Sequence, residues 1–419
     1  MSGQTFVIVG ASLAGAKAAE ALRQSGFDGR VVLVGSEAER PYQRPPLSKD
    51  YLSAKVGLEK VYLHEEGFYE RHEIELRTAT TVKGIDLGAS EVALSDGKRL
   101  GYDRLLLATG AAPRRLSLPG ADLDGIYYLR TLADSERLRE RIARGGKLVV
   151  LGAGWIGCEV AAAARQAGLA VTMIGRSSVP LEDVLGAEVG AIYRDIHADH
   201  GVELLLGTGV EAVEGDGRVE RVRTGDGREV DCDFVVAGIG ATPRTELATG
   251  TKIGISNGLL TNEYLETGVP GIFAAGDVAN AAHPLFGRLR VEHWSNALHQ
   301  GPIAARNMLG AADADDPVLD HPLAYDRVPY FYSDQYDVGM EYSGYATDWD
   351  EVVLRGDVAG RKLIVFWLKD ERILAGMNVN VWDVTTQIQA LIRSHLRVDR
   401  DRLADPGTPL TELAPPRRV

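Results

Sequence analysis

The sequence predicts an α/β protein in which two doubly wound domains are followed by a smaller α+β domain. Three observations support this fold class. An apolar run that breaks into spaced glycines and resumes as a helix occurs twice, as FVIVGASLAGAKAAEAL at 6–22 and as LVVLGAGWIGCEV at 148–160. Short apolar runs and helical patterns alternate over most of the chain. From about residue 318 the pattern changes to alternating segments such as YFYSDQYDVGMEYSGYA, which is typical of antiparallel strands.

Buried strands of a parallel sheet are expected where β-branched or leucine-rich runs occur, several of which end in glycine. These runs are 5–10, 30–35, 104–110, 147–152, 170–175, 233–240 and 271–277. Helical patterns lie between them at Ala14–Ser25, Ser135–Arg144, Gly157–Ala167 and Glu188–His200. Strands that alternate with helices at this spacing form doubly wound sheets. The acidic segment GAADADDP at 310–317 is predicted to lead into the C-terminal domain.

Composition and charge exclude several classes of function. The chain has 419 residues, 45% of them hydrophobic, which is enough for about three domains. A net charge of −13 argues against a nucleic-acid partner, which would require a basic stripe. No apolar run reaches the ~18 residues of a membrane helix, and no signal-peptide pattern is present, so we expect a cytoplasmic protein without a membrane partner. The nine histidines lack ligand spacing, and no metal site is expected.

The first glycine element has the spacing of a dinucleotide-binding turn. Gly10, Ser12 and Gly15 follow a strand and open an alanine-rich helix, where backbone N–H groups and the helix dipole face a pyrophosphate. Serine in the middle position departs from the glycine pattern but adds little bulk. The next strand ends at Ser36 and Glu37, where an acidic side chain accepts hydrogen bonds from a ribose. The alternative is a βα turn that glycine merely tightens.

The second element repeats this pattern with Gly152, Gly154 and Gly157. Two such sites indicate two nucleotides held at once, one resident and one visiting, as a flavoprotein fed by a nicotinamide cofactor requires. A duplicated dehydrogenase with a single cofactor is the alternative, and it would leave one site idle.

Eight blocks of sequence then carry a specific resemblance. In order they are RPYQRPPLSKDYL at 40–52, LLLATGAAPRRL at 105–116, YYLRT at 127–131, GAGWIGCEVAA at 152–162, AGIGATPRTEL at 237–247, IFAAGDVAN at 272–280, VEHWSNAL at 291–298 and PYFYSDQYDVGM at 329–340. The chain resembles the FAD-dependent ferredoxin reductases of the putidaredoxin reductase and biphenyl dioxygenase reductase type over nearly its whole length. The resemblance implies a glutathione-reductase-like architecture of two Rossmann-like domains and a C-terminal domain. It places FAD in 1–110 and 240–315, NAD(P)H in 111–239, and the α+β domain in 316–419.

The resemblance also assigns site residues. Lys49 matches a lysine beside the flavin, and Glu159 the glutamate that pairs with it, although either could be an ordinary residue at a helix start. Trp294 matches a residue at the dimethylbenzene side of the flavin or is a core tryptophan, whereas Tyr332 and Trp367 are interpreted as packing residues. The full set of expected cofactor-binding residues is Gly10, Ser12, Ala14, Gly15, Ser36, Glu37, Arg44, Pro45, Lys49, Val82, Ala108, Thr109, Gly110, Arg130, Gly152, Gly154, Ile156, Gly157, Glu159, Gly175, Arg176, Gly240, Gly276, Asp277 and Trp294.

The route by which electrons leave follows from the cysteines. Related disulfide reductases and oxidases use a cysteine in the loop after the first acidic position, but that loop here, at 36–49, contains none. Cys158 and Cys232 are better interpreted as small buried residues. Electrons should therefore pass directly from the flavin to a one-electron carrier, an iron–sulfur ferredoxin that supplies an oxygenase. The alternatives are another acceptor, such as rubredoxin or monodehydroascorbate, and an apoptosis-inducing-factor-like binding protein.

The choice of nicotinamide depends on the strand after the second fingerprint. Where NADH enzymes place an acidic residue, this chain has Gly175 followed by Arg176, Ser177 and Ser178. Loss of the carboxylate removes repulsion of a 2′-phosphate, and a guanidinium favours one. The sequence therefore predicts that NADPH serves at least as well as NADH; the alternative is that Arg176 points to solvent and Glu182 or a backbone group binds the ribose, which would leave NADH preferred.

Overall fold

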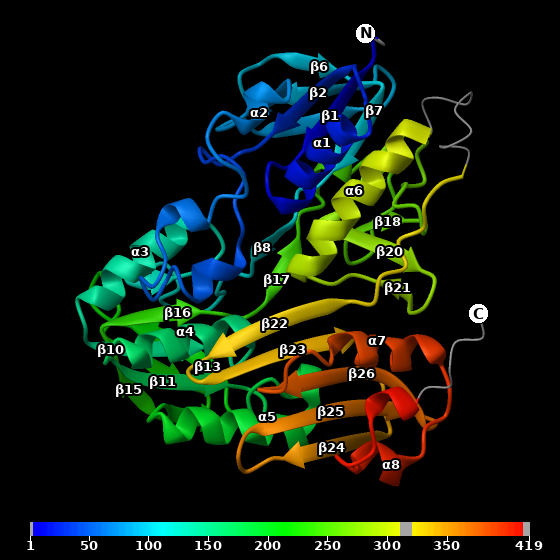
Figure 1. Cartoon of the computed structure of the whole chain (residues 1–419). Helices are drawn as coiled ribbons and strands as arrows, with labels where there is room; N and C mark the ends of the chain where they lie inside the picture. Colours follow the sequence, from blue (N-terminus) through cyan, green and yellow to red (C-terminus); the bar gives the residue numbers. More distant parts are fainter. Residues whose placement is uncertain (1–2, 311–320, 414–419) are drawn as a thin grey trace. The chain divides into compact units, whose positions relative to one another are not determined.

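The computed structural model describes residues 3–310 and 321–413, and its chain divides into two compact units. Unit 1 comprises 1–43, 58–112 and 242–330, and unit 2 comprises 44–57, 113–241 and 331–419. Unit 1 is thus assembled from segments distant in sequence (Figure 1). The three-domain boundaries expected from the sequence stay a prediction.

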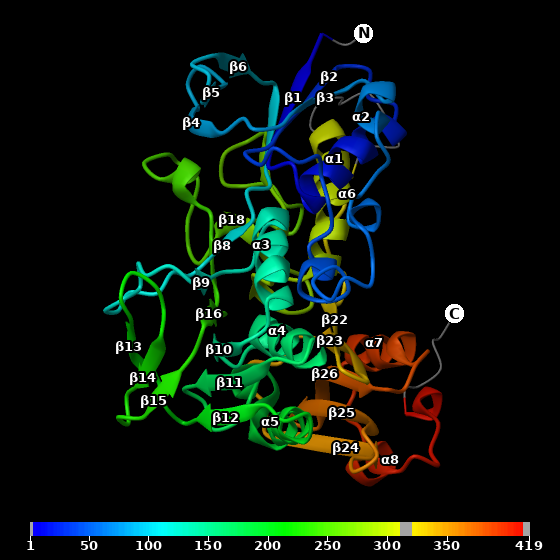
Figure 2. The same ribbon diagram turned by 90° about the vertical axis from the view of Figure 1, so that its left-hand side faces the viewer.

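A five-stranded parallel sheet forms the centre of unit 1, in the order β19-β7-β1-β2-β3. The central strand β1 is apolar on both faces of the sheet, since Phe6 and Ile8 face one side and Val7 and Val9 the other, all at most 5% exposed. Helices α1 (Leu13–Gln24) and α6 (Trp294–Gly310) pack together on the first side, as both views show (Figures 1 and 2). The strands are β1 (Thr5–Val9), β2 (Arg30–Val34), β3 (Ile74–Arg77), β7 (Arg104–Leu107) and β19 (Ile272–Ala274).

Smaller elements cover the second face of this sheet, where Val92, Leu94, Leu100 and Leu259 are buried. They form two three-stranded sheets, β4-β5-β6 and β18-β20-β21. The chain passes from one unit to the other in β8 (Ala111–Pro113) and again in β17 (Ala241–Pro243). The other short elements of unit 1 are β4 (Val82–Asp86), β5 (Glu91–Leu94), β6 (Arg99–Gly101), β18 (Leu259–Thr261), β20 (Ala279–His283), β21 (Gly287–Leu289) and α2 (Phe68–Arg71).

Unit 2 contains a second parallel sheet in the order β12-β11-β10-β16-β9. The three-stranded sheet β13-β14-β15 packs on one face through a buried cluster that includes Val149, Val213 and Val222, and Figure 2 shows it beside β10 to β12. The elements are β9 (Ile126–Tyr127), α3 (Leu132–Ala143), β10 (Lys147–Leu151), α4 (Trp155–Gln166), β11 (Ala170–Gly175), α5 (Glu182–Asp199), β12 (Glu203–Leu206), β13 (Val210–Glu214), β14 (Arg221–Thr224), β15 (Glu229–Asp231) and β16 (Phe234–Ala237).

The C-terminal part of unit 2 is an antiparallel sheet in the order β22-β23-β26-β25-β24, as the alternating sequence predicts. Trp367 is fully buried in it and donates to the carbonyl of Leu185, which fits its interpretation as a packing residue. The predicted linker lies outside the described residues from residue 311 onward. The elements are β22 (Tyr330–Gln335), β23 (Val338–Gly344), β24 (Glu351–Asp357), β25 (Lys362–Lys369), β26 (Arg372–Val379), α7 (Thr385–Ser394) and α8 (Arg400–Ala404).

All seven predicted buried strands and all four predicted helices are present, but the helices begin earlier than expected. Helix α3 begins at Leu132 rather than Ser135 because Thr131 and Asp134 form a capping box. Helix α5 begins at Glu182 and continues past a kink at Gly186, where φ is 80°. Within the described residues no helix is long and apolar enough to cross a membrane.

Candidate active site

The first glycine turn in unit 1 is built for close approach of backbone to a ligand. Gly10 has a φ of 123°, and a Cβ there would lie 2.1 Å from the carbonyl oxygen of Ala108. A Cβ on Gly15 would lie 2.0 Å from the carbonyl oxygen of Gly10. Ser12 is the N-cap of α1, and its side chain makes no capping hydrogen bond. The first-turn N–H groups of α1 therefore face the turn without a side-chain cap, as an anion site requires.

Polar groups gather at the carboxyl end of β2. The hydroxyl of Tyr42 donates to the carboxylate of Glu37, which is half-buried, while Ser36 is exposed. The guanidinium of Arg40 lies 3.7 Å over the ring of Tyr62. Its Nε is buried and has no hydrogen-bond partner among the described residues. A buried donor of this kind is suited to an anionic ligand. The sequence prediction missed Arg40, although it lies only three residues after Glu37.

The remaining predicted residues of unit 1 lie in several separate segments of the chain. Gly276 opens a short turn after β19, and its N–H donates to the side chain of Gln300 at 2.8 Å. The carbonyl of Asp277 accepts from Arg290, and the indole of Trp294 donates to Gln43 at 3.1 Å. Ala14 is buried in α1 and Val82 is buried at the start of β4, whereas Ala108, Thr109 and Gly110 follow β7.

Unit 2 repeats the first turn in detail. Gly152 has a φ of 102°, and a Cβ there would lie 2.3 Å from the carbonyl oxygen of Gly238. A Cβ on Gly157 would lie 2.0 Å from the carbonyl oxygen of Gly152. Gly154 is the N-cap of α4. Beside this turn Ile156 is 39% exposed and Gly240 is exposed. The uncapped helix start and its exposed apolar neighbour suit a second nucleotide.

A buried ion pair joins Lys49 to Glu159 of α4. The Nζ of Lys49 is 2.8 Å from Oε1 of Glu159, and the two side chains are only 10% and 4% exposed. The hydroxyl of Ser48 donates to Oε2 of Glu159, and the hydroxyl of Ser333 donates to Oε1 at 2.7 Å. The carboxylate therefore accepts from three donors, which offset its desolvation. The pairing of Lys49 and Glu159 matches the sequence prediction, whereas neither serine was predicted.

Arg44 and Arg130 also come together in unit 2, because the guanidinium of Arg44 donates to the carbonyl of Arg130. Arg44 precedes the short 3₁₀ helix Pro45–Ser48, which carries Pro45 and leads to Lys49. Unit 2 thus unites the predicted residues Arg44, Pro45, Lys49, Arg130, Glu159 and the second fingerprint, whereas Gly10, Glu37, Asp277 and Trp294 belong to unit 1.

The end of β11 carries no carboxylate. A Cβ on Gly175 would lie 3.0 Å from Cβ of Ala153 and 3.2 Å from Leu206, so the strand end has little room for an acidic side chain. Arg176 is exposed and makes no hydrogen bond or ion pair with the described part of the chain. The carboxylate of Glu182 accepts from the N–H groups of Ser178 and Val179 and from the hydroxyl of Ser178, and these bonds lower its pKa. Glu182 is thus already engaged by its own loop.

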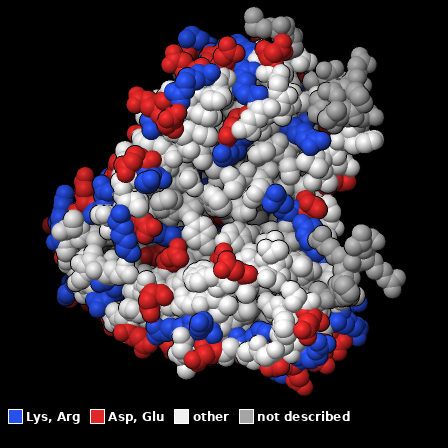
Figure 3. Space-filling view, viewed as in Figure 1, with Lys and Arg blue, Asp and Glu red and all other residues white. Residues whose placement is uncertain are grey.

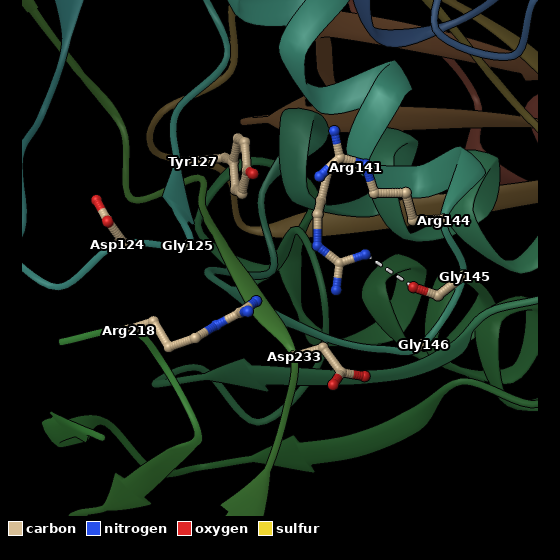
Figure 4. Close-up of a pocket in the computed structure, with 9 residues that line it drawn as sticks. All are labelled: Asp124, Gly125, Tyr127, Arg141, Arg144, Gly145, Gly146, Arg218 and Asp233. Atoms are coloured by element: carbon tan, nitrogen blue, oxygen red, sulfur yellow. Dashed lines mark hydrogen bonds between the residues drawn. The ribbon is translucent and has the colours of Figure 1, made fainter. Parts of the chain in front are cut away.

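A cavity of about 680 Å³ in unit 2 lies elsewhere, and Figure 4 shows the side chains of Arg141 and Arg218 pointing into it. It is lined by Gly146, which precedes β10, and by Asp233, which precedes β16. Nucleotides bind at the carboxyl ends of parallel strands. This cavity is at the amino ends and is not the predicted nucleotide site.

The two cysteines are inaccessible for redox chemistry. Cys158 is fully buried in α4 and Cys232 is 5% exposed. Burial raises the pKa of the Cys158 thiol, and it raises the pKa of the Cys232 thiol to about 12. The interpretation of both as small buried residues is confirmed. Reactive cysteines instead have lowered pKa values and access to solvent.

Comparison with known proteins agrees with these features. Residues 4–301 match the family described as pyridine nucleotide-disulphide oxidoreductase, and residues 330–414 match the domain described as reductase C-terminal. The chain is 37% identical to putidaredoxin reductase of Pseudomonas putida over 97% of its own length and 96% of that protein. It is 35% identical to rubredoxin-NAD(+) reductase of Ectopseudomonas oleovorans, over 90% of this chain and 96% of that protein.

A crystal structure of the covalent putidaredoxin reductase–putidaredoxin complex superposes with a TM-score of 0.92 at 36% identity, over 98% of each chain. The predicted architecture of Rossmann-like domains with a C-terminal domain is therefore confirmed, as is the resemblance to reductases of this type. By the matches over both of its parts, this chain belongs to the pyridine nucleotide-disulphide oxidoreductase family.

Proposed function

We propose that this chain is an FAD-dependent NAD(P)H:ferredoxin reductase. The observation that carries the proposal is the pair of dinucleotide-binding turns, at Gly10 and Gly152, in a chain whose two cysteines are both buried. Two turns of this kind serve two nucleotides. Buried thiols leave the flavin itself as the point at which electrons depart. Full-length similarity to putidaredoxin reductase supports the same assignment.

The residues present fit FAD. In unit 1 the turn of Gly10, Ser12 and Gly15 would receive the pyrophosphate, and Glu37 with Arg40 would hold the adenosine end. Asp277 would accept hydroxyl groups of the ribityl chain. Arg44 and Arg130 would supply positive charge for the nucleotide. When bound, FAD accepts a hydride from NAD(P)H and releases electrons singly.

Lys49 and Glu159 act on the visiting nicotinamide. Glu159 lies two residues after Gly157 of the second fingerprint, and its carboxylate is paired with Lys49 at 2.8 Å. It would orient the carboxamide of the nicotinamide by accepting its N–H. The ammonium of Lys49 would stabilise negative charge on the reduced flavin. Both groups are fixed before substrate arrives, because Ser48 and Ser333 hold the carboxylate.

The electron acceptor is a small two-iron ferredoxin that supplies an oxygenase. The relative named as a rubredoxin-NAD(+) reductase favours rubredoxin as a second candidate acceptor. Monodehydroascorbate and an apoptosis-inducing-factor-like binding role are further outcomes of the test below. We infer a cytoplasmic location for the protein, where both nicotinamides and ferredoxins are found.

A steady-state assay tests this function. The purified protein should be yellow, and the flavin released from it by acid should be FAD. With NADH or NADPH it should reduce a two-iron ferredoxin at a rate that saturates with ferredoxin. Faster reduction of rubredoxin or monodehydroascorbate would reassign the acceptor. Absence of turnover with every acceptor, together with a long-lived reduced protein, would favour a binding role.

The nicotinamide preference depends on Arg176. Replacement of Arg176 by alanine should raise the KM for NADPH about 10-fold and leave the KM for NADH nearly unchanged, because an exposed guanidinium contributes about 1.5 kcal/mol to a phosphate contact. The structure favours this change over an acidic residue at position 175, where Ala153 leaves little space. Measurement of kcat/KM for both cofactors, with the exposed Arg218→Ala as a control, decides the matter. Equal kcat/KM values for the parent and Arg176→Ala with NADPH would exclude the role.

Docking of the ferredoxin should be electrostatic. Acidic and basic side chains are intermingled on the face shown in Figure 3, and the chain as a whole carries a charge of −13. An acidic ferredoxin therefore needs a local basic patch, which we predict at the exposed edge of the flavin. The second-order rate of ferredoxin reduction should fall about 10-fold between 50 and 500 mM salt, because screening weakens steering. A flat or rising salt response would indicate an apolar interface.

A further inference from the structure

A hydrogen-bonded row of buried polar side chains extends from Glu159 to helix α5. All members of this row belong to unit 2. Ser333 of β22 donates to Glu159 at 2.7 Å, Gln335 of the same strand lies 3.2 Å from Ser333, and His197 of α5 lies 3.0 Å from Gln335. These four side chains are between 0% and 4% exposed. At the outer end the hydroxyl of Tyr336 is 3.1 Å from His197.

The donors in this row of side chains all point toward Glu159. The amide Nε2 of Gln335 donates to the hydroxyl oxygen of Ser333, so the single proton of Ser333 is left for Glu159. The amide Oε1 of Gln335 accepts, so the facing Nε2 of His197 must carry a proton. The Nδ1 of the neutral ring then accepts from Tyr336. Burial lowers the pKa of His197 to about 4, which keeps the ring neutral at pH 7.

This direction has a consequence for Glu159. If the amide of Gln335 were reversed, its oxygen would face Ser333, and the hydroxyl would donate to Gln335 instead of the carboxylate. With His197 in its Nε2–H tautomer, the reversed amide would place two buried N–H groups face to face, and only the Nδ1–H tautomer, which would donate to Tyr336, could accommodate the reversal. The tautomer of His197 is therefore coupled to the direction in which the Ser333 hydroxyl donates, two side chains away.

We propose that His197 and Gln335 are positioning residues for Glu159, which fix Ser333 as a donor to its carboxylate. The inference rests on the proposed function, since it concerns the same ion pair, and it adds residues of α5 and β22 to that site. Neither residue reaches the reacting atoms. Their effect is on the orientation and hydrogen bonding of the carboxylate that binds the nicotinamide carboxamide.

A double-mutant cycle on Ser333 and His197 separates positioning from a structural role. Ser333→Ala should slow reduction of the bound flavin by NADH about 10-fold, and His197→Leu about 5-fold, because each removes a hydrogen bond to a charged group or its orientation. In the Ser333→Ala background, His197→Leu should add less than about 2-fold, since no hydroxyl remains to orient. His197→Gln, which places an amide N–H near the lost Nε2, should restore most of the rate.

Two further readouts do not depend on turnover. The dissociation constant of NAD⁺, measured by titration calorimetry, should rise by about the same factors in Ser333→Ala and His197→Leu. In protein labelled with ¹⁵N-histidine, NMR should show His197 as the Nε2–H tautomer at pH 7. Gln335→Met, which keeps the side-chain length without donor or acceptor, should remove that preference and provides a second route if His197→Leu fails to fold.

The outcomes distinguish the two proposals. Multiplicative effects of the two substitutions, or a loss of thermal stability with unchanged rate and NAD⁺ affinity, would overturn the positioning role while leaving Lys49 and Glu159 in place. An unchanged rate of flavin reduction in Lys49→Met would instead remove the ion pair from the mechanism. The hydrogen-bonded row that positions Glu159 would then have no role in the reaction. An Nδ1–H tautomer of His197 would overturn the proposal by itself.

Discussion

Replacement of Lys49 by methionine should slow reduction of the bound flavin by NADH about 100-fold while FAD stays bound. Methionine keeps the length of the lysine stem and removes the charge. A single preorganised electrostatic donor at a reacting centre is worth about 10²–10³ in rate. Retention of FAD is expected because the Gly10 turn and Glu37 belong to unit 1 and are not altered. Stopped-flow absorbance of the flavin measures the rate, and the flavin-to-protein absorbance ratio measures retention.

The same substitution should also destabilise the protein, since it leaves the carboxylate of Glu159 buried at 4% exposure without its cation. Removal of one partner of a buried pair costs about 3–5 kcal/mol. The double variant Lys49→Met with Glu159→Gln removes the uncompensated charge. It should regain most of the thermal stability but not the rate. If the rate recovers along with the stability, the pair has a structural role only.

Replacement of Gly10 by alanine should prevent formation of yellow protein. The φ of 123° is unfavourable for any residue with a Cβ, and the new Cβ would lie 2.1 Å from the backbone oxygen of Ala108. Neither the strand nor the turn can move without breaking the pairing of β1 with β7. The expected cost is about 4 kcal/mol or more. The absorbance ratio and thermal unfolding of the purified protein measure it.

The twin position offers a matched comparison. Gly152→Ala meets the carbonyl of Gly238 at 2.3 Å with a φ of 102°, so it should be similarly strained, but in unit 2. It should abolish reduction by both nicotinamides while the FAD-binding turn of unit 1 remains intact. Gly84→Ala, where no atom lies within 4 Å of the added Cβ, should have little effect on either. Normal FAD content in Gly10→Ala would show that this turn does not hold the cofactor.

Sequence reasoning succeeded where the information is local. The pattern of a strand, spaced glycines and a helix predicts both dinucleotide turns, because the backbone conformation of the turn and the hydrophobic periodicity of the flanking elements depend on consecutive residues. Resemblance to ferredoxin reductases added the Lys49–Glu159 pair, whose members lie 2.8 Å apart in the structure. The predicted first residues of the helices were less accurate. The capping box at Thr131 and the kink at Gly186 involve residues that do not belong to the apolar pattern from which the helices were predicted.

Long-range polar contacts could not be predicted from one sequence. Ser333 is separated from Glu159 by 174 positions, and Gln335 from His197 by 138. A serine in a strand or a histidine in a helix has no local feature that announces a buried partner. Arg40 was missed for a related reason, because only the structure shows that its Nε is buried without an acceptor. Such residues are found by checking which buried polar atoms of the folded chain have hydrogen-bond partners, information that hydrophobic periodicity in the sequence does not contain.

We infer that a hydride enters the flavin and that single electrons leave it without a thiol. The stoichiometry of ferredoxin reduction in the cysteine-free variant Cys158→Ala with Cys232→Ala tests this inference. Under anaerobic conditions, limiting NADH and excess two-iron ferredoxin should give two reduced ferredoxins per NADH oxidised, at a rate within about 2-fold of the parent, since buried thiols with raised pKa values do not react. Loss of ferredoxin reduction in a variant that keeps its FAD and is still reduced by NADH would show that a thiol carries the electrons to the ferredoxin.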